Sequence, residues 1–83
     1  MIPREIRAEH VRAAIAEIER NGVAPSRQSK RYHLVYRGRR YPPKYVVSLA
    51  ARHATGQALP SKTFYGGPET NRCLRNLGFE ITS

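Results

Sequence analysis

The chain has 83 residues, and 15 lysines and arginines against six acids give it a formal net charge of +9. This length fits one domain, residues 1–83, whose core is too small for an enclosed cofactor pocket. The single cysteine, Cys73, excludes an internal disulfide and a multi-cysteine zinc site. No apolar stretch reaches the roughly 18 residues of a membrane span, and no signal peptide follows Met1, so we expect a cytoplasmic protein.

The first predicted helix ends at Asn21-Gly22, which tolerate the left-handed conformation of a helix C-terminus. Its apolar residues recur at helical spacing: Val11, Ala14, Ile15 and Ile18. Two oppositely charged i,i+3 pairs lie along it: Glu9–Arg12 and Glu17–Arg20. Residues 1–20 carry no net charge, which predicts a self-neutralised scaffold helix.

The whole net charge falls in residues 21–62, which contain nine cations and no acid. These are Arg27, Lys30, Arg31, Arg37, Arg39, Arg40, Lys44, Arg52 and Lys62. Such a segment predicts a polyanionic partner, with nucleic acid favoured over a membrane surface. Arginine outnumbers lysine twelve to three, which indicates either a preference for phosphate or guanine, or the codon bias of a GC-rich genome.

A basic loop over residues 23–31 leads into a predicted β-hairpin. Residues 32–36 have high β-strand propensity, Arg37-Gly38-Arg39 forms the turn, and Arg40-Tyr41 forms a short second strand beside the first. The tip therefore carries three guanidinium groups. Tyr32 and Tyr36 share a strand face with Leu34, which favours core packing over stacking on bases.

Pro42-Pro43 stops the second strand and starts a helix. Val46, Leu49, Ala50 and His53 fall on one face, and Lys44, Ser48 and Arg52 fall on another. Lys44 in the first turn opposes the helix dipole, so it either binds an external anion or is a solvated surface lysine. The basic elements form one surface only if the hairpin folds against the start of this helix.

Thr55-Gly56 ends the second helix and opens a long loop whose second half is Ser61-Lys62-Thr63-Phe64-Tyr65-Gly66-Gly67. This segment either receives a phosphate or only shapes the turn into Pro68. Pro68 begins the last helix, Gly78 caps it, and residues 79–82 form a third strand. The predicted fold is a small α+β domain of order α-β-β-α-α-β, with a three-stranded, mostly antiparallel sheet packed by helices. We expect the chain to be cut from a larger multidomain protein.

Catalysis is weakly supported, because the three histidines show no metal-ligand spacing and the chain has no aspartate. We predict a non-catalytic domain without a metal or cofactor. Aromatics interleaved with the cations favour nucleic-acid binding, since they can stack on bases while the cations hold phosphates. Tyr41 and Tyr65 are the best candidates to meet a base or its methyl group. The predicted DNA-binding residues are Arg27, Lys30, Arg31, Arg37, Arg39, Arg40, Tyr41, Lys44, Ser48, Arg52, Lys62, Tyr65 and Gly66.

Three runs resemble a known family: residues 41–50 (YPPKYVVSLA), residues 64–71 (FYGGPETN) and Leu77-Gly78-Phe79. They are similar to the N-terminal head domain of ScoMcrA-type type IV restriction endonucleases, over about Ile6 to Ile81. The resemblance implies an accessory domain of a bacterial defence nuclease whose other domains read 5-methylcytosine or phosphorothioate in DNA and carry an HNH nuclease. It supplies no catalytic residue, because the HNH motif is absent from this sequence.

We therefore expect the domain to bind double-stranded DNA, with 5-methylcytosine-modified DNA as the favoured form. Two alternatives remain open: a homodimerisation or docking module that contacts other domains of the parent nuclease, and an RNA-binding module. Charge and aromatics alone do not separate RNA from DNA.

Overall fold

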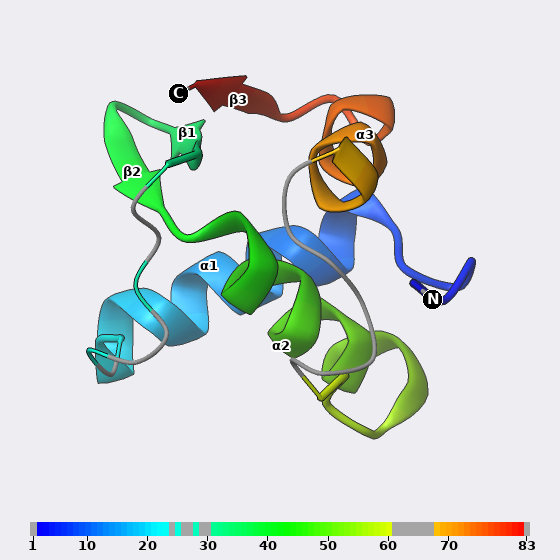
Figure 1. Cartoon of the computed structure of the whole chain (residues 1–83). Coiled ribbons are helices and arrows are strands. Elements are labelled where there is room, and N and C mark those ends of the chain that lie inside the picture. The colour runs from blue at the N-terminus through cyan, green and yellow to red at the C-terminus, as the bar shows by residue number, and fades with distance from the viewer. Residues whose placement is uncertain (1, 24, 26–27, 29–30, 61–67, 83) are drawn as a thin grey trace.

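The computed structural model describes residues 2–23, 25, 28, 31–60 and 68–82. In chain order they form α1 (Ala8–Asn21), β1 (His33–Tyr36), β2 (Arg39–Tyr41), α2 (Pro43–Thr55), α3 (Pro68–Asn76) and β3 (Glu80–Thr82), as Figure 1 shows. This is the predicted order, so the α+β class is confirmed. No helix among these residues is long and apolar enough to cross a membrane.

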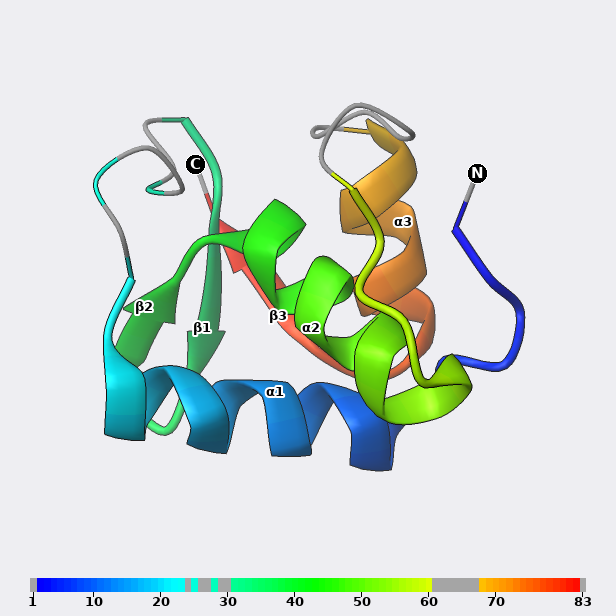
Figure 2. The same cartoon turned by 90° about the horizontal axis from the view of Figure 1, so that it is seen from below.

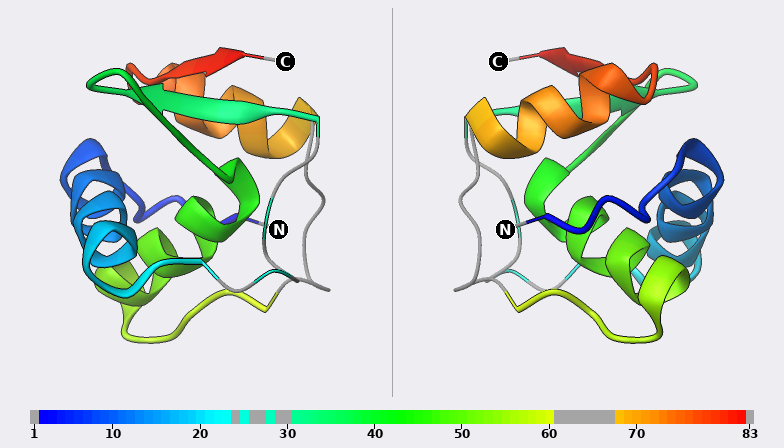
Figure 3. Two further views of the ribbon diagram at one scale, coloured as in Figure 1. Left: turned by 90° about the vertical axis from the view of Figure 1, so that its left-hand side faces the viewer. Right: turned by 90° about the vertical axis from the view of Figure 1, so that its right-hand side faces the viewer.

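The strands form one sheet in the order β2-β1-β3, and both pairings are antiparallel. Leu34 lies opposite Tyr41 on one side and Ile81 on the other, and these three side chains share one face. The next row, Arg40, Val35 and Glu80, faces the opposite way. Figure 3 shows α1 and α2 on one side of the sheet and none of the described helices on the other. Among the described residues, the sheet therefore has one face packed by helices and one face, called here the open face, that no helix covers.

The central element of the core is α2, which lies between α1 and α3 (Figures 1 and 2). Its residues from Val46 to Ala51 are all buried. Since an α-helix turns once in about 3.6 residues, a run of this length is buried on every side. The described chain after the helix returns along it, where the amide of Leu59 donates to the carbonyl of Ser48 (3.3 Å). From α1, the predicted residues Val11, Ala14, Ile15 and Ile18 are buried in the same core.

The end of α3 fixes how the chain enters β3. Gly78 has a φ of 93°, in the left-handed region that favours glycine. Its amide donates to Arg75 (3.0 Å), and the amide of Phe79 donates to Leu74 (3.0 Å). This is the Schellman pattern of helix ends, in which the residue after glycine packs back on the protein. Phe79 is accordingly buried.

Candidate nucleic-acid interface

A two-residue turn joins β1 to β2, because Tyr36 pairs directly with Arg39. Both central residues have positive φ, 52° at Arg37 and 78° at Gly38. This is the type I′ geometry, whose twist matches that of the flanking strands. Glycine adopts it readily, whereas a residue with a β-carbon does so at a cost of about 1–2 kcal/mol. The chain therefore holds an arginine in a strained backbone conformation at the hairpin tip.

The guanidinium of Arg37 lies over the ring of its neighbour. Its Cζ is 5.3 Å from the centroid of the Tyr36 ring, a cation–π distance. Tyr36 in turn packs against Phe79, with ring centroids 5.8 Å apart and planes tilted by 49°. Tyr36 thus packs within the protein, which confirms the core interpretation of its strand face. The same ring positions the arginine at the tip.

Arg39 and Arg40 are consecutive on β2, so their side chains point to opposite faces of the sheet. Arg39 points toward α1, where its Nη1 is 4.0 Å from Oε1 of Glu19 while its side chain stays 73% exposed. Arg40 is exposed on the open face. The three hairpin arginines therefore occupy the tip and both faces of one ribbon.

The structure makes Tyr41 a core residue with 4% of its surface exposed. Its hydroxyl donates a 2.5 Å hydrogen bond to Oε1 of Glu19. Burial, helped by the hydrogen bond and the negative charge of Glu19, raises the pKa of Tyr41 to about 12. The ring has no open face to offer a base, so we leave Tyr41 out of the proposed interface.

Two of the three predicted DNA-binding residues on α2 make contacts within the protein. Ser48 is buried, and its hydroxyl donates to the carbonyl of Leu59 at 2.6 Å, because the chain after α2 folds back over this face. Arg52 forms an ion pair with Glu17 on α1. Of the three residues, Lys44 is half-buried in the first turn, which contains no acid.

Glu17 connects α1 to the last turn of α2. One of its carboxylate oxygens accepts a hydrogen bond from Nη2 of Arg52 and lies 3.1 Å from Nε2 of His53. Burial alone would raise the pKa of Glu17, but these hydrogen bonds and the charges of Arg52 and His53 hold it below its ordinary value. His53 was predicted to end the packed face of α2; instead it is exposed and contacts this carboxylate.

The prediction of a self-neutralised α1 is also wrong. Among the described residues, no ion pair joins Glu9 to Arg12 or Glu17 to Arg20. Glu17 and Glu19 flank the apolar stripe, so tertiary contacts bring them to Arg52, Arg39 and Tyr41. Part of the basic segment is thereby neutralised, and the arginines of α1 are left exposed. The position of these glutamates beside the buried stripe is the sequence signal that could have revealed the contacts.

The basic elements do not converge on one point. The hairpin tip lies at one end of β2, beneath α1 in Figure 2, and α2 begins beyond the other end. Arg31, whose Cζ is 5.4 Å from the ring centroid of Tyr32, precedes β1 and so lies away from the tip. Five other predicted residues lie outside the described part of the chain: Arg27, Lys30, Lys62, Tyr65 and Gly66. The best-defined basic feature is therefore the hairpin.

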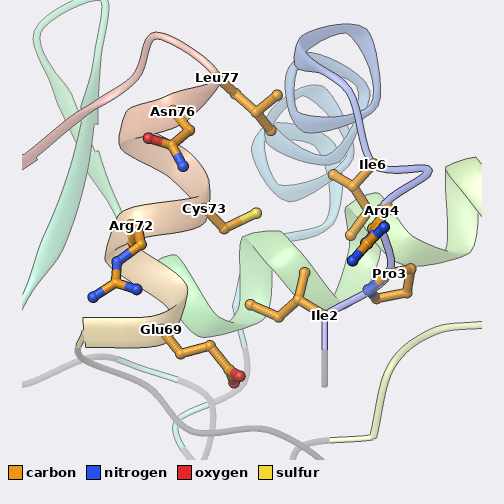
Figure 4. A pocket seen from close by; sticks show the side chains of 9 residues that line it. All are labelled: Ile2, Pro3, Arg4, Ile6, Glu69, Arg72, Cys73, Asn76 and Leu77. Atoms are coloured by element: carbon orange, nitrogen blue, oxygen red, sulfur yellow. The ribbon is translucent and has the colours of Figure 1, made fainter.

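A pocket opens on another side of the molecule, between the segment before α1 and α3 (Figure 4). Its lining is partly apolar, with Arg4, Glu69 and Arg72 among its polar residues. Burial, and the charge of Glu69 to a smaller degree, raise the pKa of Cys73 in this pocket. A raised pKa disfavours the reactive thiolate. The described residues contain no group of three or more His, Cys or Glu side chains placed to hold a metal ion.

The fold and the site define a small α+β domain with an arginine-bearing hairpin. A comparison with protein families identifies the family of this domain. Residues 4–83 match the family described as "ScoMcrA-like, N-terminal head domain". The chain belongs to this family, as its YPPK and FYGGPETN runs suggested, which is consistent with a domain of a restriction system. No curated protein and no solved structure matches it.

Proposed function

We propose that this domain is a non-catalytic accessory domain of a restriction system that binds double-stranded DNA through its hairpin arginines. The observation that carries the proposal is the exposure of Arg37, Arg39 and Arg40 on one hairpin. Within the described residues, the one acidic contact of these three is that of Arg39 with Glu19 at 4.0 Å. Guanidinium groups suit phosphate oxygens, so this hairpin offers affinity for a DNA backbone.

A preference for 5-methylcytosine is the finer part of the proposal. Its support is the family, because ScoMcrA-type proteins are expected to act on modified DNA. Of the two aromatic candidates for a methyl contact, Tyr41 lies in the core and Tyr65 lies outside the described residues. A methylation preference would thus require residues other than Tyr41.

A competition experiment tests the partner and the modification together. A labelled duplex DNA bound to the 83-residue chain is displaced with the same unlabelled duplex, its 5-methylcytosine form, or duplex RNA of the same sequence. We expect the methylated DNA to compete best and the RNA worst. Equal competition by RNA would favour the RNA-binding alternative, and no binding to any duplex would leave a docking or dimerisation module.

The salt dependence of binding measures the number of phosphate contacts. Arg31 and the three hairpin arginines are exposed. If three or four of these guanidinium groups each neutralise one phosphate, log K should fall with log salt with a slope of about −3 to −4. An affinity independent of salt would contradict the proposal.

A further inference from the structure

The residue at the hairpin tip is unfavourable for the turn that it occupies. Type I′ turns prefer Asn-Gly, because asparagine tolerates positive φ better than other residues with side chains. Here Arg37 takes that position with a φ of 52°. Local backbone strain of this kind is retained where the side chain has another use.

The fold also fixes the position of that side chain. Arg37 lies over Tyr36, and Tyr36 packs on Phe79, which the end of α3 places beneath it. An arginine supported in this way loses less conformational freedom on binding than an arginine in open solvent. The guanidinium group of Arg37 is thus partly preorganised to donate to two neighbouring hydrogen-bond acceptors.

The tip of the hairpin extends past the end of the third strand. β3 pairs with β1 over His33 to Val35, so Tyr36 and the turn extend beyond β3 as a two-stranded ribbon. The major groove of B-DNA, about 12 Å wide, admits such a ribbon, whereas the minor groove is only about 6 Å wide. Arg40, in the row behind the tip, would then face phosphates on the open side of the sheet. Arg39, 73% exposed beside Glu19, would face phosphates on the side of α1.

From these observations we infer that the β1–β2 hairpin enters the major groove and that Arg37 donates hydrogen bonds to O6 and N7 of a guanine. Arginine paired with these two acceptors is the commonest base-specific contact in protein–DNA complexes. The inference rests on the proposed function and adds to it the groove, the base and the residue that reads it. Arg39 and Arg40 supply affinity, and Arg37 supplies base selectivity.

The test compares two duplexes of one sequence, one with guanine and one with 7-deazaguanine, which lacks the N7 acceptor. The analogue keeps O6, so it removes one of the two hydrogen bonds of a contact that discriminates by about 5- to 100-fold, and the native chain should bind the 7-deazaguanine duplex about two- to tenfold more weakly. Equal affinity for the two duplexes, with salt-dependent binding intact, would overturn the inference and leave the proposed function standing. Absence of binding to both duplexes would overturn the proposed function as well.

Variants at Arg37 separate base reading from folding and from charge. Arg37→Asn should raise the melting temperature, because Asn-Gly suits the turn, and should abolish the preference for guanine. Arg37→Lys keeps the charge but replaces the planar fork with a single ammonium that can still donate to guanine, so its preference between the duplexes should be smaller than that of the native chain. Arg72→Lys is the matched control, because Arg72 belongs to α3 and lines the pocket. This variant should discriminate between the two duplexes as the native chain does. A preference for guanine that persists in Arg37→Asn would refute the inference.

Discussion

The hydroxyl of Tyr41 donates a 2.5 Å hydrogen bond to Glu19 while its ring lies in the core. In the sequence this tyrosine stands between Arg40 and Pro42, beside the cations that suggested stacking on a base. The register of β2 decides its role, because Tyr41 lies opposite Leu34 on the packed face while Arg40 points the other way. At the scale of single residues, strand alternation separates the core aromatic from the exposed cation.

The raised pKa of Tyr41 predicts a loss of stability in alkali. The folded state favours the neutral phenol, so its contribution is complete below pH 10, the ordinary pKa, and disappears as the pH rises toward about 12. At about 1.4 kcal/mol for each pKa unit, the free energy of unfolding that is lost in alkali amounts to roughly 2–3 kcal/mol. Denaturant unfolding of the native chain and of Tyr41→Phe between pH 8 and 12 measures it.

The phenylalanine variant supplies the reference for that experiment. At pH 8 it should be about 1 kcal/mol less stable than the native chain, because one hydrogen bond is lost and the half-exposed Glu19 can still be hydrated. Above pH 10 its stability should fall less steeply. Parallel curves for the two proteins would show that Tyr41 does not titrate as the structure indicates.

At the scale of elements, two carboxylates of α1 contact residues of other elements. Glu17 faces the last turn of α2, and Glu19, on the other flank of the apolar stripe, faces the hairpin. The two acids thus hold two different elements against one helix. The charges of this helix cancel in the sequence, but in the fold its acids form ion pairs with Arg39 and Arg52.

Glu17→Gln should weaken the contact between α1 and α2 by about 1–2 kcal/mol, the range expected for hydrogen bonds to charged groups that are partly screened by solvent. The lowered pKa of Glu17 means that its stabilisation is present above the ordinary pKa of 4.5 and is lost as the pH falls through the folded value. Unfolding experiments at pH 7 and below pH 4 should therefore show a difference between native and variant that shrinks in acid.

Glu9→Gln provides the matched control, because Glu9 is an exposed residue of α1 without an ion pair among the described residues. It should change stability by less than about 0.5 kcal/mol. If both variants behave alike at pH 7, the Glu17 contact contributes nothing to the fold.

At the scale of the whole molecule, the net charge of +9 is distributed differently from the linear pattern. The sequence concentrates it in residues 21–62, but Glu17 and Glu19 neutralise part of that segment. The arginines of α1 are exposed in exchange. The exposed cations therefore include the hairpin arginines and also arginines that the linear pattern assigned to a neutral scaffold.

This distribution predicts that two variants of equal charge differ in DNA affinity. Glu19→Gln and Glu9→Gln each raise the net charge by one, but only Glu19 lies beside a hairpin arginine, 4.0 Å from Arg39. A charge pair at that distance in water is worth about 1 kcal/mol, so Glu19→Gln should bind duplex DNA up to about fivefold more tightly. Equal gains for both variants would indicate that net charge alone sets the affinity.

The sequence by itself determined the helices, the strands and their order, because each follows from local signals. Val11, Ala14, Ile15 and Ile18 mark one helix by their spacing, Pro43 and Pro68 begin the other two, and Gly78 ends the last. It also placed three arginines at the hairpin, since a turn depends only on adjacent residues.

Only the tertiary structure decided which of the predicted site residues are available. Tyr41 and Glu19 are 22 positions apart, and Arg52 and Glu17 are 35 apart. The position of the two glutamates beside the apolar stripe indicates that they face a neighbouring element, but the identity of that neighbour depends on how the helices and the sheet pack. Those contacts placed Tyr41 in the core, paired Arg52 with Glu17, buried Ser48 and left the three hairpin arginines exposed.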